Sequence, residues 1–419
     1  MGARVASAAQ WLRRFIATTP GMISLIALGL VVVCLAGALT TQQQMSSKIE
    51  RADTALTDTE PLAFAAQRLY VALSVADATA ATAFLSGGIE APEVRAQYQQ
   101  SLADAAAALS DTTIGASDAL TRHSVARIAA DLPAYTGLVE AARANNRQGF
   151  PVGSSYLREA SDLMRNSLLP TAEGLTSSRF AAVRADEHTI GTPPWSSVLV
   201  LLLVLLGCAA ASVLLLRQTN RRLNVGVAAA ATFAALALVW AVAATAIAST
   251  RVDTGAAGAS SRFETLAKAR ISAQQARADE TLQLVTRGDV EEGEQLFTQH
   301  EAQLRAQIDA ALPAGSDAGA QLGEWGKGHV VQVEAYRSAD YPAAVKQAIG
   351  NTPESSATRF ALLDRSLNDS LADARNELRD GLDSARTTLT FSPSATLVLL
   401  VLGAAAAATG LWPRLKEFL

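Results

Sequence analysis

Charge is missing from four long stretches of this sequence. None of the four contains Asp, Glu, Lys, Arg or His, and each is rich in Leu, Val and Ala. A helix needs about 20 apolar residues to cross the hydrocarbon core of a bilayer, and soluble helices of that length rarely lack charge altogether. The sequence therefore predicts four transmembrane helices, over residues 22–41, 195–216, 225–248 and 393–412.

The first of these stretches has a second interpretation as a cleaved signal peptide. Arg13 and Arg14 precede it, and the small residues Ala36, Gly37 and Ala38 fit a cleavage site. The stretch at 225–248 is its counterpart in the middle of the chain and cannot be a signal peptide. We therefore prefer a retained transmembrane helix.

Cysteine and histidine are scarce. The two cysteines, Cys34 and Cys208, both lie inside predicted spans, so no disulfide can cross-link the long segments between the spans. The four histidines show no metal-ligand spacing, and no nucleophile elbow, phosphate-binding loop or kinase motif is present. The sequence predicts a protein without metal or cofactor that is not an enzyme.

Ionisable residues are also missing from the spans. Ion-coupled transporters usually place charged groups near the middle of the membrane, where such groups are costly and therefore functional. A coupled pump is thus disfavoured, although the chain is expected to sit in a lipid bilayer.

Basic residues are concentrated in the short segments that flank the spans. Residues 1–21, 217–224 and 413–419 hold eight basic residues and one acidic residue, whereas 42–194 has 12 and 17 and 249–392 has 15 and 21. Under the positive-inside rule, both termini and the 217–224 hairpin are cytoplasmic at the plasma membrane. Topology explains these charges, so no nucleic-acid partner is expected.

The two long segments read as helical bundles related by an internal repeat. They are rich in Ala, Leu and charge, with helical periodicity. Glycine and proline clusters divide each into about four helices. The breaks are expected at 87–88, at Gly115 or Pro133, and at 149–153 in the first segment, and at 288, 313–319 and 350–353 in the second. The predicted fold is an all-α membrane protein with two extracytoplasmic four-helix bundles (42–194 and 249–392) in tandem repeat.

Three charged residues in the bundles are candidates for contact with a ligand or partner. Asp77 falls on the apolar seam of the first helix, where it could contact a ligand or fix the register of the helices in the bundle. Arg270 and Arg277 lie at a comparable height beside Asp279 and Glu280, where they could meet an anionic amino acid. We prefer the plainer alternatives: a partly exposed Asp77 paired with an arginine, and a solvated charged face around the two arginines.

Aromatic residues are few, but a tryptophan, a histidine and a tyrosine lie on one predicted helix. Trp325, His329 and Tyr336 form a sparse row along it. Such a row is more often part of a core or surface than of a pocket.

The stretch RLYVALSVADATAATAFLSGGIE, together with the four-span tandem layout, resembles an actinobacterial membrane protein family. Its members are encoded beside a glutamate/glutamine-binding lipoprotein and the soluble serine/threonine kinase G. The outer domains also resemble the four-helix-bundle sensor domains of chemoreceptors. The resemblance implies a transducer that reads the loaded lipoprotein outside and controls the kinase inside.

Two functions follow as hypotheses. The first is a non-enzymatic sensor, which could act as a homodimer and whose cytoplasmic partner surface would include Arg13, Arg14, Arg217, Arg221 and Arg222. Its first and third spans are expected to continue into the outer helices, while Pro193-Pro194 and Pro393 act as hinges. The second is a structural or accessory subunit of an envelope or transport complex.

Overall fold

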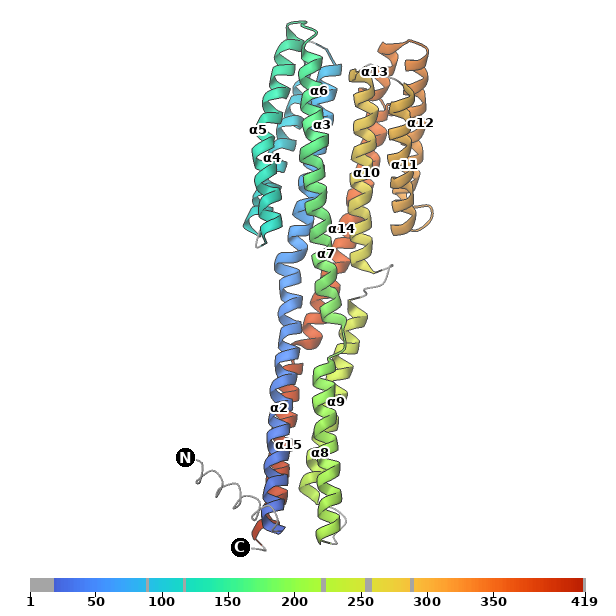
Figure 1. Cartoon of the computed structure of the whole chain (residues 1–419). Helices are drawn as coiled ribbons and strands as arrows, with labels where there is room; N and C mark the ends of the chain where they lie inside the picture. The colour runs from blue at the N-terminus through green and yellow to red at the C-terminus, as the bar shows by residue number, and fades with distance from the viewer. Residues whose placement is uncertain are drawn as a thin grey trace. The chain divides into compact units, whose positions relative to one another are not determined.

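The computed structural model describes residues 19–87, 90–115, 118–219, 224–252, 258–286 and 290–416. All regular structure in these ranges is helical, as Figure 1 shows. Within the same ranges, four helical stretches are long and apolar enough to cross a membrane. The predicted all-α membrane protein with four transmembrane helices is therefore confirmed.

The helices fall into an apolar set and two polar sets. The apolar set comprises α2 (Thr19–Thr54), α8 (Trp195–Thr219), α9 (Val225–Arg251) and α15 (Ser392–Lys416). The first polar set comprises α3 (Glu60–Leu85), α4 (Pro92–Ile114), α5 (Ala119–Arg147), α6 (Gly153–Leu163) and α7 (Leu169–Gly191). The second comprises α10 (Ala259–Thr286), α11 (Val290–Ala311), α12 (Asp317–Arg337), α13 (Tyr341–Ile349) and α14 (Ser356–Thr390). Two short π-helical segments, η1 (Ala55–Thr59) and η2 (Met164–Leu168), precede α3 and α7.

These helices form two compact units. The membrane unit contains the residues up to Asp53, Asp186–Val252 and the residues from Gly381 onward. The second unit, here called the outer unit after the topology that the sequence predicts, contains Thr54–Ala185 and Asp253–Asp380. Both outer segments therefore pack into one unit rather than standing as separate domains.

The membrane unit has an apolar core and an apolar exterior. Cys34 and Cys208 are buried in its core as free thiols. Large apolar side chains such as Leu28, Leu206 and Val239 are exposed on its outside. An exposed apolar surface of this kind suits contact with lipid chains rather than water.

Helices α9 and α15 approach each other most closely at two glycines. A Cβ atom added to Gly410 would lie 2.3 Å from the Cα of Gly226, and one added to Gly226 would lie 2.4 Å from the Cα of Gly410. Asn224 reinforces this contact, because its side chain caps the first turn of α9 and also donates to the Gly410 carbonyl at 3.1 Å. Small residues allow such close packing of membrane helices.

Lys48 of α2 caps the end of α7. Its Nζ donates to the carbonyl oxygens of Thr189, Ile190 and Thr192 at 2.9, 2.8 and 2.6 Å. Burial lowers the pKa of Lys48 to about 8. Carbonyl groups at a helix C-terminus lack partners in their own helix, so this lysine satisfies them just before the chain turns at Pro193.

Helix continuity differs between the first and third spans. The first runs without a break from Thr19 to Leu85 through α2, η1 and α3, as predicted. The third does not, since α9 ends at Arg251 and α10 begins at Ala259. That part of the prediction was wrong, because the backbone of Val252, with φ −100° and ψ 80°, leaves the helical conformation directly after α9.

The predicted proline breaks before the second and fourth spans are present, although the two differ in length. Pro193 and Pro194 lie between α7 and α8, whereas a single residue, Phe391, separates α14 from α15.

The outer unit is built around a contact between α3 and α10. In Figure 1, α4 and α5 lie on one side of this pair and α11 and α12 on the other. Of the two alternatives for the second break, the chain uses Gly115, and Pro133 lies inside α5. The second half contains one more helix than predicted, because a turn with Ala339 at a φ of 61° separates α12 from α13.

Aromatic rings and one buried carboxylate join four helices of the outer unit. Phe263 of α10 contacts Phe180 of α7, with ring centroids 5.0 Å apart, and Phe64 of α3, at 6.5 Å. Arg375 of α14 lies over the Phe64 ring at 3.8 Å. It also pairs with the fully buried Glu60 of α3 at 2.5 Å. Helices α3, α7, α10 and α14 are thus packed together at this level.

Replacement of Gly410 by valine is expected to destabilise the membrane unit. The new side chain would collide with the backbone of α9, and such overpacking costs about 1–3 kcal/mol. Thermal unfolding of the detergent-solubilised chain measures the effect. The matched control is Gly29→Val, because a Cβ at Gly29 meets nothing within 4 Å. Equal midpoints for the two variants would show that the glycine contact does not hold α9 to α15.

Candidate functional site

Among the cavities that α3 and α10 line together in the outer unit, two together contain all three candidate site residues. The first, here called the Asp77 cavity, has a volume of about 190 Å³. The second, here called the arginine groove, has a volume of about 710 Å³ and contains Arg270 and Arg277. Gln274 of α10 lines both. The three candidate site residues therefore border cavities of the outer unit.

Asp77 is buried and bonded to hydroxyl groups. Its Oδ1 accepts hydrogen bonds from Tyr135 Oη of α5 at 3.3 Å and from Ser161 Oγ of α6 at 3.0 Å. The residue is 6% exposed. Burial raises the pKa of Asp77 to about 6, although the bond from Ser161 and the charge of Arg165 oppose the rise.

The preferred interpretation of Asp77, a partly exposed carboxylate paired with an arginine, was therefore wrong. The seam position was correct, but the partners of Asp77 are hydroxyls from two other helices. Its own helix is buried on most sides, because α3 packs against α10 as well as against its own bundle.

Arg270 lies on the arginine groove in an ion pair. Its Nε and Nη2 donate to the two carboxylate oxygens of Asp364 of α14 at 2.8 and 3.0 Å. A further bond joins Nη1 to Asn368 Oδ1 at 2.7 Å. This two-pronged geometry binds α10 to α14 and occupies the guanidinium.

Arg277 is buried rather than solvated, so the preferred solvated-face interpretation was wrong here as well. It is 6% exposed, pairs with the fully buried Glu280, and donates to the carbonyl of Ala348 at 2.9 Å. Glu280 also accepts a bond from Trp325 Nε1 at 3.3 Å and contacts His329 Nδ1 at 3.2 Å. A charged network thus fills the centre of the second bundle.

Opposite charges keep this network ionised. Burial alone would raise the pKa of Glu280, but the charge of Arg277 and the bond from His329 lower it to about 2. Burial would lower the pKa of His329, but its bonds to Glu280 and Glu294 raise it to about 9. Phe297 stacks on the His329 ring at 3.5 Å. The aromatic row, expected to be part of a core or a surface, is core at Trp325 and His329, which are 0% and 4% exposed.

The two bundles place equivalent polar groups at their centres. In the first, a carboxylate from the first helix bonds an aromatic donor from the third and a serine from α6: Asp77, Tyr135 and Ser161. In the second, the corresponding groups are Glu280, Trp325 and Ser356, with the serine at the start of α14. The sequence analysis did not predict these hydrogen bonds, because a tyrosine, tryptophan or serine does not reveal its partner until the helices are packed together.

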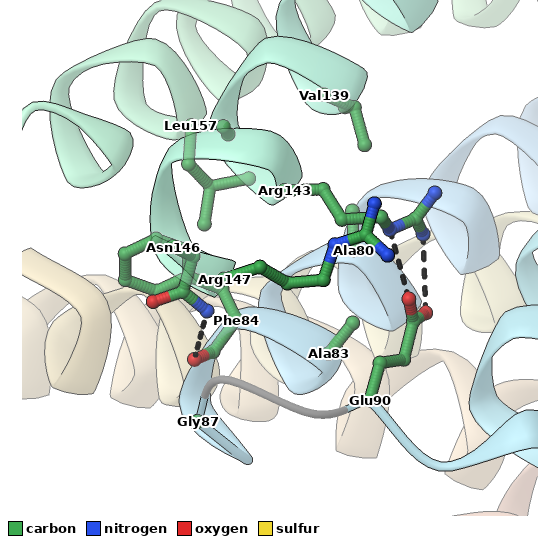
Figure 2. Close-up of a pocket in the computed structure, with 11 residues that line it drawn as sticks. Ala80, Ala83, Phe84, Gly87, Glu90, Val139, Arg143, Asn146, Arg147 and Leu157 are labelled. Carbon is green, nitrogen blue, oxygen red and sulfur yellow. Dashed lines mark hydrogen bonds and ion pairs between the residues drawn. The ribbon is translucent and has the colours of Figure 1, made fainter. Parts of the chain in front are cut away.

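A third pocket, drawn in Figure 2, lies at the end of the first bundle. Its volume is about 20 Å³, which suits a water molecule rather than an organic ligand. Arg143 pairs there with Glu90, its Nε lying 2.8 Å from Oε2, and Asn146 donates to the Phe84 carbonyl at 3.3 Å. These bonds hold the helix ends together, so the pocket is structural.

Of the five arginines predicted for the cytoplasmic surface, Arg217 is exposed on α8. The other four, Arg13, Arg14, Arg221 and Arg222, lie outside the described residues. No cluster of His, Cys, Asp and Glu suited to a metal ion occurs in the described part of the chain.

The comparison with protein families supplies the functional context for this geometry. Residues 51–188 match the family model described as an actinobacterial sensor domain. No curated protein and no solved structure matches the chain. The matched segment includes α3 and the helices that surround Asp77. Together with the four apolar helices, the match supports a multi-pass transmembrane sensor and indicates a non-enzymatic role.

The burial of Asp77 predicts a pH-dependent stability. Its pKa in the folded chain, about 6, lies above its ordinary value of 3.8, so protonation favours folding. The stabilisation is complete below about pH 4 and is lost as the pH rises through about 6. The Asp77→Asn variant stays uncharged, and its stability relative to wild type is expected to rise between pH 5 and 7.5 by roughly 1–1.5 kcal/mol. Urea unfolding of the full chain in detergent measures this difference. A difference that does not change with pH would contradict the burial of Asp77.

Glu280→Gln is expected to destabilise the outer unit strongly. The change leaves Arg277 and His329 buried without their shared negative partner, and breaking such a network costs about 3 kcal/mol or more. Urea unfolding is again the measurement. Glu324→Gln is the matched control, because Glu324 lies on the surface of α12 and pairs with Lys327 at 2.5 Å. If both variants unfold like wild type, the ionised network does not support the fold.

Proposed function

We propose that the chain is a transmembrane sensor that receives its signal in the outer unit and passes it to a protein in the cytoplasm. One observation carries this proposal. The helix from Thr19 to Leu85 is unbroken, and it bears the first span as well as Asp77 and two other residues of the Asp77 cavity, Tyr70 and Ser74. A change at the cavity can therefore act on the backbone of the same helix that crosses the bilayer. The sensor-domain match begins on this helix, at residue 51.

The direction of signalling follows from the charge distribution. The short segments 1–21, 217–224 and 413–419 are basic, whereas the outer unit is acidic. The positive-inside rule supports cytoplasmic termini and an extracytoplasmic outer unit. In this orientation the five arginines beside the spans face the cytoplasm, where they form the surface for a partner.

The inputs and outputs rest on the resemblance to the actinobacterial transducer family. The outer unit would read a binding lipoprotein loaded with glutamate or glutamine. The cytoplasmic surface would then regulate a serine/threonine kinase. The arginine groove is wide enough for a segment of a protein partner, whereas the two arginines in it are already paired with acidic residues of the chain.

The relay requires movement where α7 ends and α8 begins, and a disulfide can block that movement. A Cβ atom built on Gly191 lies 3.7 Å from the Cβ of Ser249 of α9. This separation falls within the range of about 3.5–4.5 Å found in disulfides. The double variant Gly191→Cys/Ser249→Cys should therefore form a bond that fixes the end of α7 to α9.

In native membranes, the oxidised double variant is expected to lose its response. The measurement is the phosphate that the captured kinase transfers when the binding lipoprotein is added with and without glutamine. Reduction should restore the response, and the single variants Gly191→Cys and Ser249→Cys should respond throughout. If the fully oxidised chain responds like wild type, the proposed relay is wrong. A chain that captures no kinase would favour a structural or accessory role.

A further inference from the structure

The Asp77 cavity holds a buried polar group without a hydrogen-bond partner. Tyr70 of α3 is 0% exposed and lines the cavity. Its hydroxyl makes no hydrogen bond of acceptable geometry with any described residue, although Ser74 and Gln275 lie near it. Leaving such a group unsatisfied costs about 1–3 kcal/mol, so a partner from outside the chain would be favourable.

Negative charge dominates the same cavity. Asp77, Glu173 and Asp279 line it; burial raises the pKa of Tyr70, and the charges of Glu173 and Asp279 raise it further. Glu173 is exposed at the cavity and forms no ion pair with any described residue. The cavity therefore has a carboxylate, as well as the Tyr70 hydroxyl, available to a ligand.

The positive groups of the cavity are already engaged. Arg165 pairs with Asp162 at 2.8 Å, and His300 Nδ1 lies 2.6 Å from Asp279 Oδ2. An anionic ligand would face three carboxylates with one arginine to oppose them. A ligand with a positive charge and several hydrogen-bond donors would instead be attracted, because the carboxylates and the phenol oxygen can accept its hydrogen bonds.

We propose that the Asp77 cavity binds a small organic cation that carries an ammonium group. The group donates to the carboxylate of Glu173 and to the hydroxyl oxygen of Tyr70, and the aliphatic part of the ligand lies against Leu169, Pro170 and Ala278. The volume of about 190 Å³ is below the range of drug-sized ligand pockets, so the ligand is a simple amine rather than a peptide. The inference deepens the proposed sensor function by assigning a ligand class to the cavity on its signalling helix.

Titration of the full chain in phosphatidylcholine nanodiscs tests this site. The probe is n-butylammonium chloride, and the controls are n-butanol, which has the same shape without the charge, and sodium butyrate, which has the opposite charge. Isothermal titration calorimetry at pH 7.5 is expected to show saturable binding of n-butylammonium. Butanol and butyrate should bind at least tenfold more weakly.

Three variants locate the binding. Glu173→Gln, at an exposed position, and Tyr70→Phe, which keeps the ring, are each expected to weaken n-butylammonium binding about tenfold. Glu159→Gln is the control, because Glu159 is an exposed acid of α6 that does not line the cavity. The proposal fails if n-butylammonium does not saturate, if butanol binds equally well, or if Glu173→Gln and Tyr70→Phe bind like wild type.

The ligand site and the signal relay are tested by separate experiments, so either proposal can fail without the other. The titration needs no kinase and no lipoprotein, so saturable binding by a chain without kinase output would overturn the relay and leave the ligand site standing. A working relay without n-butylammonium binding would overturn only the ligand class.

Discussion

The packing of α3 against α10 is the interaction on which the outer unit depends. A helix at the edge of a bundle keeps one face in water, but α3 is buried on most of its surface because a second bundle covers the face that its own bundle leaves free. This arrangement explains the many alanines of α3, since small side chains allow close approach on several sides at once. It also joins the apolar cores, as Ile271 and Val285 of α10 belong to the same cluster as Tyr70 and Leu73.

Burial on this scale makes internal partners favourable for the polar side chains of the two central helices, and both Asp77 and Glu280 have them. The two bundles supply these partners in different ways. Around Asp77, neutral hydroxyls supply the bonds and burial raises the pKa of the carboxyl to about 6. Around Glu280, an arginine and a histidine supply positive charge and the carboxylate stays ionised. Asp77 gains or loses its proton near physiological pH, whereas Glu280 stays ionised. The surroundings of Asp77 are therefore the more sensitive of the two to a change in pH.

The membrane unit constrains how any change in the outer unit can travel. Its spans carry no Asp, Glu, Lys, Arg or His, the groups that ion-coupled membrane proteins usually place there. The relay that we propose is therefore one of helix movement. The first span has an unbroken helical path, whereas α9 ends before α10 begins and prolines interrupt the path at α8. Lys48 ties the first path to the end of α7, the glycine contact ties α9 to α15, and α8 packs against α9.

Composition and periodicity alone determined the four spans, the all-α class, the placement of both cysteines in the membrane and the basic flanks, because each of these depends on local hydropathy and charge. The same local signals placed Asp77 on a seam, but they left open whether Trp325 lies in a core or on a surface. They could not show that a second bundle covers α3, and this is why Asp77 and Arg277 were expected to be exposed or solvated when both are buried. The partners of Asp77 are 58 and 84 residues away in the sequence, and Glu280 meets Trp325 45 residues on. Contacts between residues so far apart are set by helix packing, so only the tertiary structure decided which polar groups meet and which cavity they line.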